Sequence, residues 1–171
     1  EWVLGPTMAY TCAVFPRADS TLEQAQAEKL DLVCRKLGLQ PGMRVLDVGC
    51  GWGGFALHAA GNYGVEVVAV TLSEQQARWG QRAVREAGLE GLVDLRHSDY
   101  RAVPETGFDR IASIGLTEHI GQSNYPDYFG FLRSRLVDGG RLLNHCITRT
   151  DPKARTYTRN GFINRYIFPD G

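Results

Sequence analysis

Long apolar runs, a surplus of charge and paired cysteines are all missing from this sequence of 171 residues. No stretch approaches the roughly 20 apolar residues that a membrane-spanning helix needs, and the first residues given lack the pattern of a signal peptide. The 19 basic and 19 acidic residues give a formal net charge of zero. This balance argues against a nucleic-acid partner, because phosphate contacts need a basic surplus. The four cysteines lie far apart without a CxxC pair, so we expect reduced thiols in a cytoplasmic protein rather than a zinc ribbon.

The sequence does contain enough apolar material, 43% of its residues, to bury the core of one compact domain. It has no initiator methionine, and we predict that the chain is a piece of a longer protein. Charge is uneven near the C-terminal end, where Asp151 is the single anion among six cations. This cluster would suit anionic headgroups or phosphates, or it belongs to a solvated loop that is mobile over residues 149–160. The cations are Arg141, Arg149, Lys153, Arg155, Arg159 and Arg165.

Strand and helix patterns alternate along most of the chain. Residues 1–18 show no period and predict an irregular arm, whereas Ser20 and Glu23 have the spacing of a capping box before a helix over residues 22–37. Short apolar runs bounded by turn residues predict strands, and helical patterns lie between them. This alternation implies an α/β fold, a Rossmann-like doubly wound and mostly parallel sheet. The expected strands are residues 43–48, 66–70, 93–97, 108–114 and 141–147, and the later helices are residues 53–63, 73–88 and 126–136.

The strongest single signal is the glycine-rich turn after the first expected strand, residues 45–54 (VLDVGCGWGG). Glycines there let the backbone turn sharply and approach a ligand at the sheet edge where such folds bind ligands. Gly49, Gly51 and Gly54 also satisfy the dinucleotide fingerprint, so the glycines alone leave a nicotinamide cofactor or a purely structural turn open. No phosphate-binding lysine follows, which excludes a P-loop. With Asp47 before the glycines, the segment resembles motif I of Rossmann-like S-adenosylmethionine (SAM) methyltransferases.

The segment after the second expected strand departs from the usual cofactor pattern. Dinucleotide sites and most SAM enzymes place an acidic residue there to hold the ribose hydroxyls. Residues 71–76 (TLSEQQ) instead offer the neutral Gln76 for this contact, which counts against an NAD site. Ser73 and Gln76 also have the spacing of a capping box, with Ser73 expected to be the N-cap of the helix that follows.

Several short motifs occur in order along the chain. They are residues 8–13 (MAYTCA), the glycine-rich turn, Thr71 to Ser73 with Gln76, the pair Asp99-Tyr100, and residues 118–121 (EHIG), 144–148 (NHCIT) and 164–169 (NRYIFP). Together they resemble the cyclopropane-fatty-acyl-phospholipid synthase family, which includes the mycolic acid cyclopropane synthases, over nearly the whole chain. The resemblance implies a SAM-dependent methyltransferase domain over residues 19–171, incomplete at its C-terminus, with residues 1–18 as an arm over the site.

By this resemblance SAM is the cofactor. The arm, the glycine-rich turn and the ends of the second and third strands would bind it, with the Tyr100 ring near the adenine. The expected contacts are Tyr10, Thr11, Asp47, Gly49, Gly51, Gly53, Thr71, Leu72, Gln76, Asp99 and Tyr100.

The resemblance also implies a bound bicarbonate ion beside the cofactor. Cys12, Glu118, His145 and the backbone amide of Ile147 would hold it as the catalytic residues, and the family's ligating tyrosine lies beyond the end of this chain. Glu118 and His145 lie at the ends of the fourth and fifth expected strands, which are neighbours in the expected strand order, so we expect their side chains to converge.

No metal is expected. A site from Cys12, His119 and His145 would lack any local ligand spacing, and we interpret both His119 and His97 as structural.

The reaction that the resemblance implies adds a methylene group to the double bond of an unsaturated phospholipid acyl chain, giving a cyclopropane ring. An isolated alkene is a weak nucleophile, so the sulfonium methyl group must be held in line with it. A base must remove one proton to close the ring, and a dry, apolar pocket must keep water from the cationic stage.

Two alternatives stay open. One is a methyltransferase that leaves a methyl branch or acts on another small lipid, and the other is a SAM-binding fragment without catalysis, because members of this superfamily usually have more than five strands. We expect a cytoplasmic protein, with peripheral attachment to the inner membrane face and a homodimer left open.

Overall fold

Five parallel strands form the sheet at the centre of the computed structural model, which describes residues 3–148 and 161–167. The strand order is β3-β2-β1-β4-β5, and every neighbouring pair is parallel. The predicted α/β fold with a doubly wound parallel sheet is thus confirmed. The order reverses beside β1, so the carboxyl ends of β1 and β4 flank the point where open α/β sheets bind ligands. The strands are β1 (Arg44–Val48), β2 (Glu66–Thr71), β3 (Val93–His97), β4 (Phe108–Ile114) and β5 (Leu136–His145).

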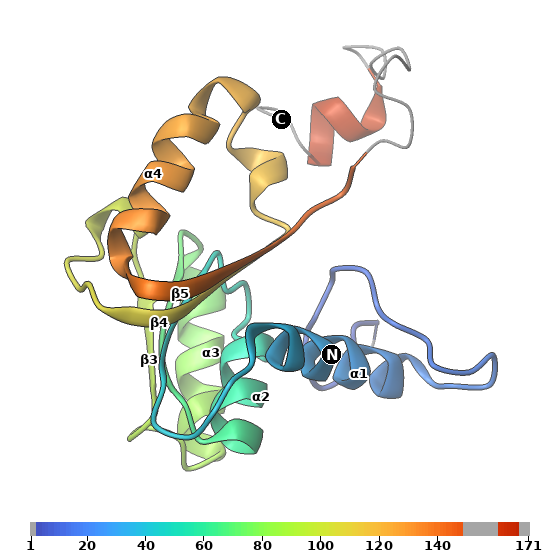
Figure 1. Ribbon diagram of the computed structural model, residues 1–171. Coiled ribbons are helices and arrows are strands. Elements are labelled where there is room, and N and C mark those ends of the chain that lie inside the picture. Colours follow the sequence, from blue (N-terminus) through green and yellow to red (C-terminus); the bar gives the residue numbers. More distant parts are fainter. Residues whose placement is uncertain (1–2, 149–160, 168–171) are drawn as a thin grey trace.

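Helices cover both faces of the sheet (Figure 1). Helices α1, α2 and α3 pack on one face over a core that includes Leu30 and Phe55. Helix α4 packs on the other face, where Tyr128 and Leu132 are fully buried with Phe108. No described helix is long and apolar enough to cross a membrane. The helices are α1 (Leu22–Leu37), α2 (Gly54–Tyr63), α3 (Glu74–Glu86) and α4 (Tyr125–Arg135), with 3₁₀ turns at Tyr100–Ala102, Thr117–His119 and Gln122–Asn124 and a π-helical turn at Ile163–Ile167.

The start of α1 differs by one residue from the expected capping box. Thr21 is the N-cap, its hydroxyl accepting from the Gln24 amide at 3.2 Å while the Gln24 side chain accepts from the Thr21 amide at 3.0 Å. The Ser20 hydroxyl instead accepts from the Arg17 amide. The Ser20–Glu23 capping box is therefore wrong, because a second hydroxyl–acceptor pair of the same spacing lies one residue further on.

Strand β5 is longer at its start than the predicted strand 141–147. Phe108 pairs with Leu136 but Arg110 pairs with Arg141, so the residues between Leu136 and Arg141 are accommodated as an irregularity within the strand. Gly139 in this stretch has φ +75°. The sequence Asp138-Gly139-Gly140 predicts a turn before the fifth strand, but in the structure these residues form a bulge inside β5. The strand ends at His145 and leaves Ile147 beyond it.

Some expectations concern residues outside the described part of the chain. These are the predicted mobile segment 149–160 with its cations Arg149, Lys153, Arg155 and Arg159, and the last two residues of the motif at 164–169.

Candidate active site

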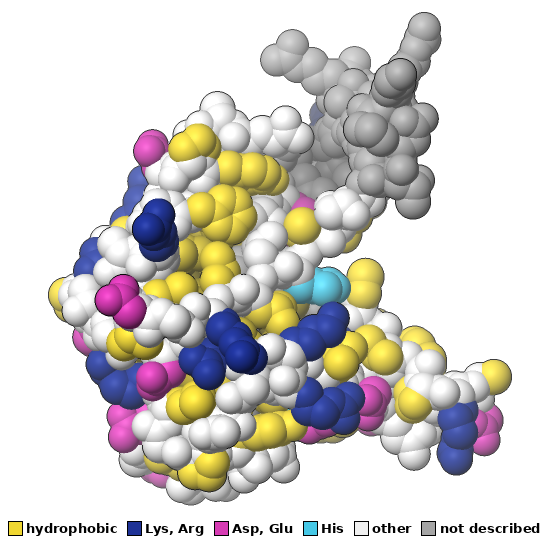
Figure 2. All heavy atoms as spheres, in the orientation of Figure 1, with side chains coloured by type: hydrophobic (Ala, Val, Ile, Leu, Met, Phe, Trp, Pro, Cys, Tyr) yellow, Lys and Arg dark blue, Asp and Glu magenta, His cyan; other side chains and the backbone are white. Residues whose placement is uncertain are grey.

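A cleft of about 660 Å³ lies at the switch point of the sheet. Residues from the carboxyl ends of β1, β2, β3 and β4 line it together with Tyr10. Tyr10 belongs to the irregular residues 3–18, here called the N-terminal segment. The space-filling view is hollowed between α4 and this segment, and hydrophobic side chains gather over α4 (Figure 2). The expected SAM contacts that line the cleft are Tyr10, Gly49, Gly51, Thr71, Leu72, Gln76, Asp99 and Tyr100.

The glycine-rich turn brings backbone to the wall of this cleft. Gly51 has φ +56°, and a Cβ atom on it would lie 3.3 Å from the Tyr10 ring. Gly53, also expected at the cofactor, does not line the cleft. It is the buried N-cap of α2 with φ +87°, and a Cβ there would lie 2.7 Å from a Leu95 methyl group. This glycine permits a turn and close packing, and its contact with the cofactor stays a prediction.

Gln76 joins the end of β2 to the N-terminal segment. Its Oε1 accepts from the Thr71 hydroxyl at 2.8 Å, and its Nε2 donates to the Tyr10 hydroxyl at 3.3 Å. Ser73 is the N-cap of α3, as predicted, and accepts from the Gln76 amide at 3.3 Å. The Gln76 side chain thus does not return to the cap; it lies in the wall of the cleft.

The third strand end supplies an acidic and an aromatic side chain. Asp99 forms an ion pair with Arg101 at 2.6 Å, and this hydrogen bond holds the pKa of Asp99 below its usual value. The Tyr100 ring packs edge-on against Tyr128 at 5.2 Å between centroids, and burial raises the pKa of Tyr100. The His97 Nε2 lies 3.0 Å from the Leu72 carbonyl, which agrees with its structural interpretation.

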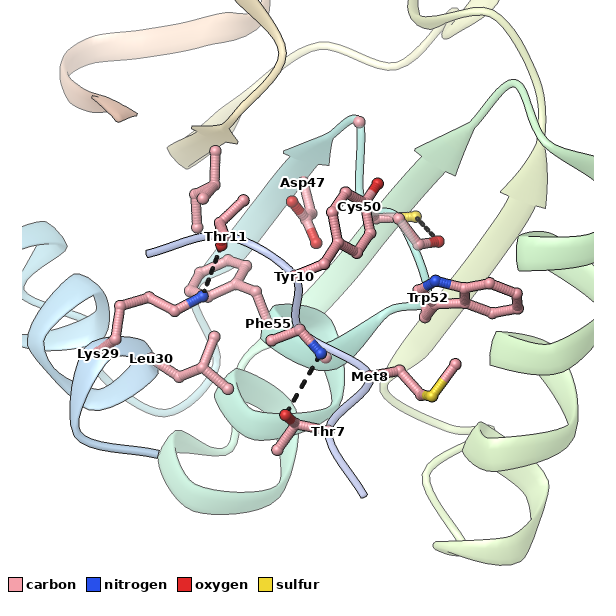
Figure 3. A pocket seen from close by; sticks show the side chains of 15 residues that line it. Thr7, Met8, Tyr10, Thr11, Lys29, Leu30, Asp47, Cys50, Trp52 and Phe55 are labelled. Carbon is pink, nitrogen blue, oxygen red and sulfur yellow. Dashed lines mark hydrogen bonds between the residues drawn. The ribbon is translucent and has the colours of Figure 1, made fainter. Parts of the chain in front are cut away.

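A second, smaller cavity of about 50 Å³ lies between the N-terminal segment and β1 (Figure 3). Asp47 lines it, fully buried, with its Oδ2 unpartnered among the described residues. Burial raises the pKa of Asp47 to about 7, although the charge of Lys29 opposes this shift. Lys29 donates to the Thr11 hydroxyl at 3.0 Å; burial lowers the pKa of Lys29, and the charge of Asp47 partly offsets that effect. Thr11 and Asp47, both expected at the cofactor, therefore face this cavity rather than the larger cleft.

Sequence reasoning missed two residues of α1 that hold the N-terminal segment. Gln26 donates to the carbonyl groups of Ala9 at 3.4 Å and Thr11 at 2.9 Å, and Lys29 binds the Thr11 side chain. Both are buried. The signal was present, because these polar residues stand inside the apolar stripe that includes Leu30.

The expected catalytic residues come together only in part. Glu118 Oε1 accepts from the Ile147 amide at 2.8 Å. The Nδ1 of His145 is buried and has no hydrogen-bond partner among the described residues. Cys12 is exposed, and no hydrogen bond within the described ranges joins it or His145 to Glu118. Glu118 and the Ile147 amide are therefore in contact, whereas the predicted convergence of Glu118 with His145, and the place of Cys12 beside them, stay predictions.

These residues adjoin the cleft without lining it. Their neighbours Leu116, His119 and Ile120 form part of its wall. His119, which we interpreted as structural, therefore faces the space that a ligand would occupy. The larger lining set also includes Arg101, Asn124 and Asp127. Within residues 3–148 and 161–167, no group of three or more His, Cys, Asp or Glu side chains has the arrangement of a metal site.

A doubly wound sheet with this glycine-rich turn and cleft at its switch point defines the class of Rossmann-like SAM-dependent methyltransferases. The family model described as mycolic acid cyclopropane synthetase matches residues 1–171. The chain belongs to this family.

Individual relatives agree. A probable fatty acid methyltransferase of Mycobacterium tuberculosis is 61% identical over 171 residues, all of this chain and 40% of the relative. The cyclopropane-fatty-acyl-phospholipid synthase of Escherichia coli K12 is 45% identical over 99% of this chain and 42% of the relative. A crystal structure of a mycolic acid cyclopropane synthase with S-adenosylhomocysteine (SAH) and CTAB superposes with a TM-score of 0.88 and 40% identity, covering 98% of this chain and 62% of that one. The chain thus spans about 40% of the length of these curated relatives.

Proposed function

We propose that the protein carrying this chain uses SAM to add a methylene group to the double bond of an unsaturated phospholipid acyl chain, forming a cyclopropane ring. The observation that carries the proposal is the juxtaposition of the cleft at the switch point with the Glu118–Ile147 hydrogen bond beside it. The cleft offers a place for the cofactor, and the adjoining polar groups offer a place for proton removal. The Escherichia coli relative's name supports a phospholipid substrate.

Different residues of the cleft and of the smaller cavity would contact different parts of SAM. Gly49 and Gly51 let the backbone approach it, because neither has a side chain to occupy that space. Gln76 takes the ribose contact, and Tyr100 flanks the adenine. Asp47 and Thr11 reach the cofactor from the smaller cavity, whose lining shares both glycines with the cleft. When bound, SAM supplies an electrophilic methyl group on a sulfonium sulfur.

The catalytic residues fit a small anion such as bicarbonate. The buried, unpartnered Nδ1 of His145 is a donor or acceptor without a use in the described structure. The Ile147 amide and the Glu118 carboxylate bond to each other in this structure. To hold the ion they would exchange that bond: the amide would donate to the ion and the carboxylate would accept its proton, with Cys12 as a further contact. When bound, bicarbonate supplies a base of small size. These residues would orient it, and Glu118 would add negative charge where a proton must leave.

A second candidate keeps the cofactor and changes the product. The relative with 61% identity is named a probable fatty acid methyltransferase, which favours an enzyme that leaves a methyl branch on an acyl chain. A SAM-binding fragment without catalysis is the third outcome.

Exposed apolar side chains beside the cleft support access from a membrane surface. Tyr10 and Leu72, 59% and 71% exposed, line the cleft, and Ile147 beside Glu118 is 64% exposed. Such side chains would contact lipid while an acyl chain enters. The proposed location is therefore the cytoplasm with peripheral attachment to the inner membrane face; a homodimer stays a prediction.

Lipid mass spectrometry tests the function. Cells that express the protein should accumulate phospholipids one methylene heavier per acyl chain, with cyclopropane proton signals by NMR. A methylene gain with retained alkene or new methyl-branch signals would favour the second candidate. SAM binding without any change in the lipids would leave only the non-catalytic alternative.

A further inference from the structure

Lys29 lies on the buried face of α1 and is only 5% exposed. A buried ammonium group is costly unless it has partners. Its Nζ donates to the Thr11 hydroxyl at 3.0 Å, and Figure 3 shows the side chain reaching from α1 to this hydroxyl beside Asp47. Lys29 therefore connects the helix to the N-terminal segment at the smaller cavity.

This contact decides how the Thr11 hydroxyl can act. A threonine hydroxyl donates one hydrogen bond and accepts up to two, whereas an ammonium group only donates. Since Thr11 Oγ1 accepts from Lys29, its own proton is directed elsewhere. The Thr11 carbonyl is held separately by Gln26 at 2.9 Å. The hydroxyl thus has a proton to donate and a fixed place from which to donate it.

The smaller cavity is chemically matched to the amino-acid end of SAM. Tyr10, Gly49 and Gly51 line both this cavity and the larger cleft, so the two spaces adjoin. The amino-acid end carries one carboxylate and one ammonium group, whereas the adenosine end carries no charge. Lys29 with the Thr11 hydroxyl offers positive charge and a donor, and the unpartnered Asp47 Oδ2 offers an acceptor.

We infer that Lys29 is a positioning residue for the cofactor: it fixes the Thr11 hydroxyl as a donor to the methionine carboxylate of SAM. The inference rests on the proposed SAM site and adds a residue that acts through Thr11. Gln26 anchors the same segment by its backbone and supplies a matched comparison, because its loss would loosen the segment without removing the directed hydroxyl.

Calorimetric titration with two ligands tests the inference. SAH has the amino-acid end, and 5′-methylthioadenosine lacks it. Lys29→Met should weaken SAH binding about 10- to 100-fold, the range for a lost hydrogen bond to a charged group, and leave 5′-methylthioadenosine binding within about twofold. Thr11→Val should give the same pattern, whereas Thr11→Ser keeps the hydroxyl and should retain SAH binding. The Lys29→Met/Thr11→Val double variant should lose little more SAH affinity than either single variant. Gln26→Met should weaken both ligands by a similar factor.

The outcomes separate this inference from the proposed function. A parent protein that binds neither ligand overturns the SAM site itself. A parent that binds SAH, with Lys29→Met weakening both ligands equally, assigns Lys29 a merely structural role and overturns the inference. Should Lys29→Met fail to fold, the Thr11 variants decide: unchanged SAH binding in Thr11→Val is incompatible with a directed hydroxyl.

Discussion

Asp47 is fully buried in β1, and one of its oxygens has no hydrogen-bond partner among the described residues. Burial destabilises the charged form of the Asp47 carboxyl group, and the charge of Lys29 stabilises it. A carboxylate in this situation destabilises the protein without a ligand and becomes useful when an ammonium group arrives. The residue thus combines a cost in folding with the acceptor that the proposed cofactor needs.

This cost predicts a pH dependence. The pKa of Asp47 rises from 3.8 to about 7 on folding. Its titration therefore stabilises the folded protein fully below pH 3.8, and this stabilisation is lost as pH rises through about 7. Asp47→Asn has no carboxyl group to titrate, so its unfolding free energy does not fall for this reason. The unfolding free energy of the variant relative to the parent should therefore increase from pH 4 to pH 8, by about 4 kcal/mol as an upper bound. Urea denaturation of the ligand-free protein at both pH values measures it.

The exposed Asp138 provides the control for that measurement. Asp138→Asn removes a carboxylate without the burial, so the difference between variant and parent should stay nearly constant across the same pH range. An equally constant difference for Asp47→Asn would contradict the account of its burial.

Glu118→Gln separates charge from geometry at the proposed catalytic site. The amide oxygen can still accept from the Ile147 amide, which now lies 2.8 Å from the carboxylate, so SAM binding should survive. Ring formation should fall about 100-fold, the lower range for lost acid–base assistance. Rates of the whole protein and its variant on phospholipid vesicles, with bicarbonate removed and then restored, measure the effect.

The control is Glu66→Gln, which changes an exposed carboxylate at the start of β2, away from the cleft. It should leave the rate nearly unchanged. Near-parental rates in Glu118→Gln, or indifference to bicarbonate, would remove Glu118 from the site while leaving the SAM assignment intact.

At the scale of residues, sequence predicted those site positions that follow from a local motif. Thr71 ends β2, Gln76 lies in the first turn of α3 after it, and Tyr100 follows β3 by three residues. All three line the cleft because the carboxyl ends of parallel strands meet at one side of the sheet. Lys29 was missed because its role depends on Thr11, which is brought to it by the path of an irregular segment. No periodicity predicts such a path.

At the scale of elements, the glycine-rich turn joins β1 to α2, and its Gly49 and Gly51 line the cleft without side chains that would fill it. Gly51→Val adds a side chain at φ +56° in front of the Tyr10 ring. It should weaken SAH binding at least about tenfold, because the branched side chain occupies space that the ligand needs. Calorimetric titration checks this, and tight NAD binding by the parent protein would contradict the assignment altogether.

Gly88→Val is the matched control for the strain of this substitution. Gly88 has φ +66°, but a Cβ there meets nothing within 4 Å. Both variants carry the cost of a left-handed backbone, and only Gly51→Val should lose SAH. Equal effects on SAH binding would assign the loss to backbone strain.

Strand β5 shows an element boundary that the sequence pattern does not predict. The residues at 138–140 have the composition of a turn, yet pairing with β4 extends through them from Leu136. Tertiary pairing overrides local turn chemistry there. The five strands and four α-helices of the described residues were predicted because hydrophobic periodicity is set by burial. The ends of a strand depend on neighbours that the pattern does not contain, and the 3₁₀ and π-helical turns were not predicted.

For the whole molecule, the alternating pattern predicts parallel strands joined by right-handed crossovers, and these rules restrict the possible strand orders without fixing one. The structure places β1 at the centre of the sheet. The order also leaves β5 at an edge of the sheet within the described structure, and unpaired strand edges invite association.

The 171-residue chain alone should therefore associate and turn over little or no lipid. Light scattering should show a mean mass that rises with concentration, because the edge of β5 can pair with another copy. Asn144→Lys places a charge on this exposed edge position and should reduce association. Asn62→Lys, which adds the same charge on the exposed surface of α2, should not. A monomeric chain that converts phospholipid vesicles at the rate of the whole protein would contradict this expectation, because the edge would then need no further cover.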